Sequence, residues 1–145
     1  MSEQGAVRYF TLEEANSTIP YISRIVEDIV AEYEKWRDCI FRYEVIAAKS
    51  TPQTESETEE QEELRQEVDS VAQRINGYID ELTQVGCIFK GFDGGLVDFR
   101  SHVEGRDVFL CWKLGEPEVQ HWHEVDSGFA GRQPLVPEFQ KGESD

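Results

Sequence analysis

Two long stretches of the chain carry apolar side chains at alternating spacings of four and three residues, which is the pattern of helices packed along a seam. The first stretch covers residues 20–48 and the second covers residues 57–85. The two seams consist, in order, of Ile22, Val26, Ile29, Tyr33, Trp36, Ile40, Tyr43 and Ala47, and of Leu64, Val68, Val71, Ile75, Tyr78, Leu82 and Val85. The spacing therefore predicts two long helices, each buried along one face.

The segment between these stretches decides how the two helices are arranged. Residues 49–56 are polar, contain Pro52 and show no apolar period, which is typical of a loop. Each helix is about 42 Å long at 1.5 Å per residue, whereas eight extended residues span at most about 28 Å. A parallel arrangement is out of reach of such a loop. The sequence therefore predicts a long antiparallel helical hairpin that resembles a coiled coil.

The first helix has recognisable start and bend signals. Thr11 and Glu14 have the spacing of a capping box, in which each side chain binds the other residue's backbone amide. Pro20 disfavours helical geometry at the residue before it, so we expect a kink at this point. Helix one is thus predicted over residues 12–48, as a kinked helix.

Beyond the second helix, predicted over residues 57–85 with Gly86 as its C-cap, the apolar period changes from helical to alternating. This alternation predicts strands at 87–92, 96–99 and 108–113, and residues 119–125 could add a short strand or a turn. Residues 87–135 are therefore expected to form a small antiparallel β-meander with a C-terminal loop, followed by a frayed tail at 136–145. We expect one α+β domain over residues 1–145.

Charge and cysteine content limit the classes of function. The chain carries a formal net charge of −16 at pH 7, which repels phosphate backbones and anionic membranes. We therefore expect neither nucleic acid nor a membrane as a partner. The N-terminus lacks the pattern of a signal peptide. The three cysteines, Cys39, Cys87 and Cys111, form no Cys-x-x-Cys pair, which favours a reducing, cytoplasmic location.

Candidate metal ligands lie in the C-terminal third of the chain. His121 and His123 are two residues apart, so on a strand both rings would project from one face, as a metal pair requires. Asp98 and Glu124 could add carboxylate oxygens. The alternative for His123, which we favour, is a structural role in which its ring fastens the C-terminal loop to the body of the protein through hydrogen bonds. No cofactor is predicted, and a divalent metal is the open alternative.

Other polar residues of this region also have two interpretations. Arg132 could tie the C-terminal loop to a buried carboxylate such as Asp98, or it could present its guanidinium to an anionic ligand. Glu116 and Glu118 could form an acid–base pair, but paired glutamates carry little information in a chain with 30 acidic residues. Cys111 stands in an apolar strand, and we expect a buried and unreactive thiol.

The helices carry the strongest indication of function. Helix one has apolar residues outside its seam, namely Ile25, Val30, Cys39, Phe41 and Ile46. A small meander covers only part of a helix of about 42 Å, so the remainder favours a partner, most simply a second copy. We therefore expect a non-enzymatic interaction and oligomerisation module that forms a homodimer through its helices, with another protein as a further possible partner. The alternative is a small metal-binding or catalytic domain whose site is the C-terminal block of Asp, His, Glu and Arg residues.

Two blocks of the sequence resemble a known family. The first is Tyr9-Phe10-Thr11-Leu12-Glu13-Glu14-Ala15-Asn16, with Pro20 shortly after it. The second comprises Gly95-Leu96-Val97-Asp98-Phe99, residues 111–117, Trp122-His123-Glu124 and residues 128–135. In these blocks the chain is similar to a bacterial family known as domain of unknown function 2203. The resemblance spans most of the chain and implies a prokaryotic cytoplasmic domain, without implying an activity.

Overall fold

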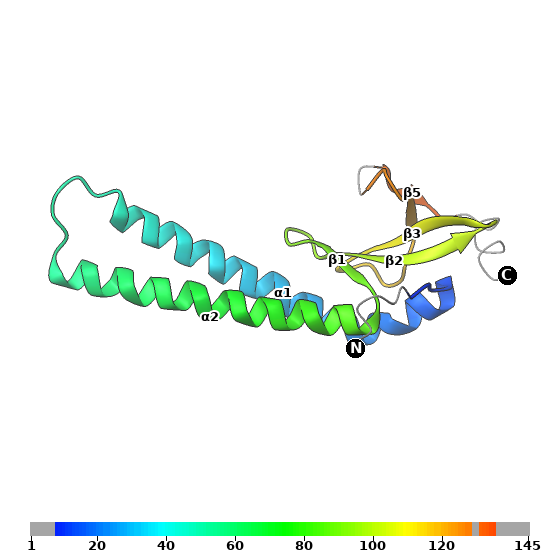
Figure 1. Ribbon diagram of the computed structural model, residues 1–145, viewed down its shortest axis with the longest axis horizontal. Helices are drawn as coiled ribbons and strands as arrows, with labels where there is room; N and C mark the ends of the chain where they lie inside the picture. The colour runs from blue at the N-terminus through cyan, green and yellow to red at the C-terminus, as the bar shows by residue number, and fades with distance from the viewer. Residues whose placement is uncertain (1–7, 129–130, 136–145) are drawn as a thin grey trace.

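The computed structural model describes residues 8–128 and 131–135, so the expected frayed tail lies outside the described residues. Two helices packed against each other are followed by a five-stranded antiparallel sheet in the order β1-β2-β3-β4-β5. The elements are α1 (Leu12–Ala47), α2 (Glu55–Val85), β1 (Ile88–Gly91), β2 (Leu96–Val103), β3 (Arg106–Lys113), β4 (His121–Glu124) and β5 (Gln133–Pro134). The predicted α+β class, a helical hairpin followed by a meander, is confirmed (Figure 1).

The ends of both helices are set by capping contacts. Thr11 and Glu14 form the predicted capping box at the start of α1. A second capping box, of Thr54 and Glu57, starts α2 two residues earlier than the apolar period indicates. Gly86 ends α2 in the left-handed conformation, with φ 108°, which is common at helix C-caps and favours glycine.

Pro20 lies inside α1, and the helix continues through it from Leu12 to Ala47. A proline has no amide proton and therefore cannot donate the helical hydrogen bond to the carbonyl four residues earlier, so a bend is expected. Figure 1 shows the blue N-terminal part of α1 running at an angle to the rest of the helix. The chain thus bends without forming two separate helices.

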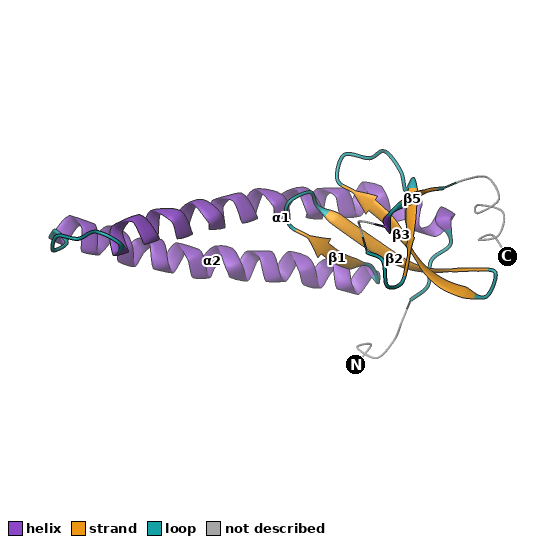
Figure 2. Ribbon diagram, turned by 90° about the horizontal axis from the view of Figure 1, so that it is seen from above, coloured by secondary structure: helices purple, strands orange, loops and turns teal. Residues whose placement is uncertain are grey.

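The main core lies between the sheet and the base of the hairpin, which is the part next to the sheet (Figures 1 and 2). One face of the sheet contributes side chains that are almost completely buried: Val97, Phe99, Val108, Leu110 and Trp112. The N-terminal half of α1 contributes Ile19, Ile22, Val26 and Ile29 to the same cluster. The other half of the hairpin projects beyond the sheet.

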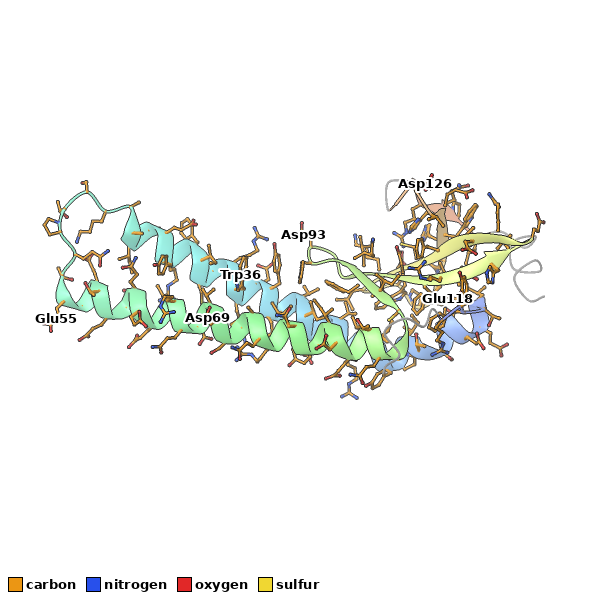
Figure 3. The ribbon with its side chains drawn as sticks, viewed as in Figure 1. Trp36, Glu55, Asp69, Asp93, Glu118 and Asp126 are labelled. Carbon is orange, nitrogen blue, oxygen red and sulfur yellow. The ribbon has the colours of Figure 1, made fainter. Side chains whose placement is uncertain are left out.

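The predicted seam of α1 is divided between two partners. Ile25 and Cys39, which lie outside that seam, are buried, and Cys39 shares a groove with Leu64 of α2. Tyr33, predicted to face α2, stacks instead on Phe92 in the turn between β1 and β2, with ring centroids 4.7 Å apart. Figure 3 shows Asp93 of this turn close to the part of α1 that carries Trp36. A helix that is covered on two sides needs two apolar stripes, so the single predicted seam does not account for all the buried residues of α1.

The segment before α1 is attached to the middle of the sheet. The Phe10 amide donates to the Arg100 carbonyl at 2.7 Å, and the Ser101 hydroxyl donates to the Phe10 carbonyl at 2.7 Å. The Phe10 ring packs edge-on against Phe99 at 5.0 Å. These contacts occupy the edge of β2 just beyond the residues that pair with β1, and they anchor the start of the hairpin to the sheet.

Gly95 marks the closest approach of the sheet to the hairpin. Its φ is 69°, and a β-carbon there would lie 2.7 Å from Cγ1 of Val26. We predict that Gly95→Ala lowers the free energy of unfolding by about 2 kcal/mol or more, through backbone strain and overpacking. Gly77→Ala is the control, because nothing lies within 4 Å of its β-carbon position in α2. That change should raise stability by about 1 kcal/mol in urea titrations, and equal effects of the two substitutions would contradict this packing.

Trp36 and Ile29 test how the hairpin is packed. Ile29 is completely buried, whereas Trp36 is only half-buried and stacks on Tyr33 at 6.0 Å. We expect Ile29→Ala to cost about 3 kcal/mol and Trp36→Ala about 1.5 kcal/mol, because the partly exposed ring loses fewer contacts. Chemical denaturation of both variants measures the difference. A larger loss for Trp36→Ala than for Ile29→Ala would show that Trp36 is the more deeply buried of the two.

Candidate functional site

A buried polar group lies on the face of the sheet that points away from α1. Side chains alternate along a strand, so Asp98 of β2 and Cys111 of β3, which are directly paired, project opposite to the core residues beside them. His123 of β4 belongs to the same face. All three are nevertheless inaccessible, with exposed fractions of 3% for Asp98, 1% for Cys111 and 2% for His123.

The ring of His123 is held from both sides. Its Nδ1 lies 2.7 Å from the backbone carbonyl of Glu124, and its Nε2 lies 3.1 Å from Oδ2 of Asp98. A carbonyl oxygen only accepts, so the proton on Nδ1 is the donor to Glu124. Both ring nitrogens of His123 thus make hydrogen bonds, as its predicted structural role requires, and the bond to Asp98 connects β4 to β2 across β3.

Burial governs the protonation of the two acidic groups in this cluster. Burial raises the pKa of Asp98, and the neighbouring His123 ring opposes this rise without cancelling it. Burial also raises the pKa of the Cys111 thiol to about 12, and the nearby Asp98 carboxylate raises it further. Cys111 is therefore a neutral thiol at neutral pH, in agreement with the buried and unreactive cysteine predicted from the sequence.

Arg132 has a different partner from the one suggested by the sequence. It binds Oε2 of Glu116 through Nη2, rather than reaching Asp98. Glu116 also accepts a hydrogen bond from the Lys113 amide at 2.9 Å, which fixes its carboxylate on the strand end. Glu118 is exposed, so the two glutamates do not share a buried setting as an acid–base pair would.

Two of the candidate metal ligands stand outside the buried cluster. Nδ1 of His121 is 3.7 Å from Oε2 of Glu116, although His121 and His123 share one strand as predicted. The carboxylate of Glu124 is bound by Arg106 at 2.9 and 3.1 Å, and only the backbone carbonyl of Glu124 meets His123. Strand alternation explains why the Glu124 side chain is absent from the cluster, because residues 123 and 124 point to opposite faces of the sheet.

Cys111, rather than Glu124, lies beside Asp98 and His123 in this cluster. Asp98, Cys111 and His123 offer three ligand atoms that all lie within 4.8 Å of one another. Within residues 8–128 and 131–135, this is the one group of three or more such side chains that are close enough to hold a metal ion. The signal that could have revealed Cys111 is the short turn between β2 and β3, which brings residue 111 opposite residue 98.

Fold and site together define an α+β protein in which a helical hairpin carries a small antiparallel sheet with a buried Asp–Cys–His cluster. The family model described as "Uncharacterized conserved protein (DUF2203)" matches residues 8–135, and the chain belongs to this family. The resemblance noted in the sequence is thereby confirmed. No curated protein and no solved structure matches the chain. None of the described helices has both the length and the apolar character that crossing a bilayer requires.

His123 and His102 provide a matched test of the buried cluster. His123→Ala would leave the buried Asp98 carboxylate without its partner, and we expect a loss of about 3 kcal/mol in the free energy of unfolding. His102 also faces an aspartate, Asp107, at 3.1 Å, but both side chains are about half exposed. His102→Ala should therefore cost no more than about 0.5 kcal/mol. Urea unfolding measures both, and a small effect of His123→Ala would exclude a fastening role.

Proposed function

We propose that this protein is a non-enzymatic interaction module that forms a homodimer through the projecting half of its helical hairpin. The observation that carries the proposal is the exposure of Phe41 and Val45, which are 65% and 56% accessible. They lie four residues apart and therefore share one face of α1. This part of the hairpin extends beyond the sheet, which leaves their apolar surface uncovered within one chain (Figure 2).

The charges of the projecting half favour a second copy as the partner. Residues 35–49 of α1 and the following loop carry four basic and two acidic side chains, whereas residues 55–69 of α2 carry eight acidic and one basic. Figure 3 shows Glu55 and Asp69 in this part of α2. A two-fold arrangement that lays α1 of one copy against α2 of the other brings opposite charges together twice. Because the whole chain carries −16, other arrangements of two copies are opposed by repulsion.

The packing between the helices also supports a partner here. An open groove between α1 and α2 is lined by charged side chains of both helices, with Cys39 and Leu64 among its lining residues. A second copy over this groove would contact its charged lining residues, whereas Cys39 and Leu64 are already buried within one chain. Three cysteines without disulfide partners further support the proposal of a cytoplasmic location.

Light scattering coupled to gel filtration tests the dimer. We expect twice the chain mass of 16.7 kDa at micromolar concentration, and the chain mass alone for Phe41→Glu, because a buried charge at the contact is costly. Tyr21→Glu is the matched control, since Tyr21 is 57% exposed but lies at the base of the hairpin. It should leave the dimer intact.

Circular dichroism melting shows whether both glutamate variants remain folded, which the exposure of the two aromatic rings leads us to expect. A wild-type protein that keeps the mass of one chain at high micromolar concentration would refute the proposed dimer. Equal dissociation by Tyr21→Glu and Phe41→Glu would place the contact elsewhere.

A further inference from the structure

We infer that Asp98, Cys111 and His123 form a binding site for one divalent transition-metal ion of borderline softness, such as Zn²⁺. The three residues come from neighbouring strands β2, β3 and β4, so the sheet itself holds them in place. Their ligand atoms lie within 4.8 Å of one another, and all three residues are buried. The inference is independent of the proposed dimer, which uses the opposite end of the molecule.

The orientation of His123 is that of a metal ligand. Its Nδ1 proton is donated to the Glu124 carbonyl at 2.7 Å, so in the neutral ring the lone pair is on Nε2. A hydrogen bond from the other ring nitrogen to a carbonyl is the usual support of a metal-binding histidine. Nε2 then faces Oδ2 of Asp98 at 3.1 Å. Two acceptors at this distance require a cation between them, which is either a proton or a metal ion.

The spacing of these atoms fits a small tetrahedral ion. Zinc binds histidine nitrogen and carboxylate oxygen at about 2.0–2.2 Å, so two such ligands in a tetrahedron are about 3.3 Å apart. The separation of 3.1 Å between Nε2 of His123 and Oδ2 of Asp98 is close to this value. With Cys111 as the third protein ligand, the fourth position is left for a small molecule such as water, as in zinc sites that are not fully closed by protein.

The ligand types and their charges select the class of metal. A thiolate is a soft ligand that Mg²⁺ and Ca²⁺ avoid and that Zn²⁺ accepts together with imidazole and carboxylate. When the metal–sulfur bond forms, the Cys111 thiol releases its proton to solvent. The carboxylate and thiolate then neutralise the two positive charges of the ion, and the His123 ring stays neutral. A complex without net charge suits a cluster of three buried residues, because an uncompensated charge there would be costly.

Cys111, the third ligand, distinguishes a metal site from a simple histidine–aspartate hydrogen bond. A proton between Nε2 and Oδ2 would satisfy His123 and Asp98 while Cys111 stays a protonated thiol that hydrogen-bonds to Asp98. A metal ion instead recruits Cys111, which is paired directly with Asp98 across the two strands. The decisive measurement is therefore one that detects a bond between metal and sulfur.

Cobalt titration of the full-length, chelator-treated protein provides that measurement. We expect one Co²⁺ per chain, with the near-ultraviolet band of a thiolate–cobalt bond, and loss of the band when an equal amount of Zn²⁺ is added. The chain has 30 acidic residues that can bind Co²⁺ weakly, but they produce no sulfur band. Absence of the sulfur band at saturating Co²⁺ would overturn the inference.

Two alanine variants locate the sulfur. Cys111→Ala should abolish the band and saturable binding, whereas Cys39→Ala, which removes another buried thiol far along the hairpin, should leave both unchanged. Circular dichroism checks that each variant is folded. If Cys111→Ala does not fold, Asp98→Asn replaces it, with at least a tenfold loss of Co²⁺ affinity expected. A band that persists in a folded Cys111→Ala protein, or unchanged affinity in Asp98→Asn, would overturn the assignment.

Discussion

Helix α1 is packed on two sides along its base, and the arrangement of the rest of the molecule depends on this. One side meets α2, as the bridge between Glu32 and Arg74 at 3.1 Å shows, and another side meets the sheet through residues such as Val26. Because the base of the hairpin covers one face of the sheet, polar residues are left to the other face. The same arrangement leaves the far half of the hairpin without a sheet to cover it.

The two faces of the sheet therefore have different physical roles. The face against α1 buries apolar side chains in the main core, whereas the opposite face holds a few polar groups in fixed positions. Asp98, Cys111 and His123 are rigid because each belongs to a strand that is hydrogen-bonded on both sides. A site built on strands keeps its geometry better than one built on loops. A small domain can in this way combine a rigid polar cluster with a long, exposed helical arm.

Much of the fold, but less of the site, could be predicted from the sequence. The two helices follow from their apolar period. The capping-box spacing of Thr54 and Glu57 indicates that α2 begins at Glu55. The two-residue turn at Glu104 and Gly105, both with positive φ, determines that residue 98 pairs with residue 111. The position of β4 depends on the seven residues after β3, for which no local rule specifies a path. The sequence therefore does not reveal that Glu124 binds Arg106 or that Arg132 binds Glu116, since both contacts depend on that path.

The attachment of Phe10 to Arg100 has a consequence for how the chain folds during synthesis. The hairpin connects residues that are near in sequence and can form as soon as α2 has left the ribosome. The strand edge that receives Phe10 is made much later, because the hydrogen bond joins residues 90 positions apart. Until then the apolar base of the hairpin, including Ile22, has no sheet to cover it. While the last third of the chain is being translated, these apolar side chains are therefore exposed and can promote aggregation.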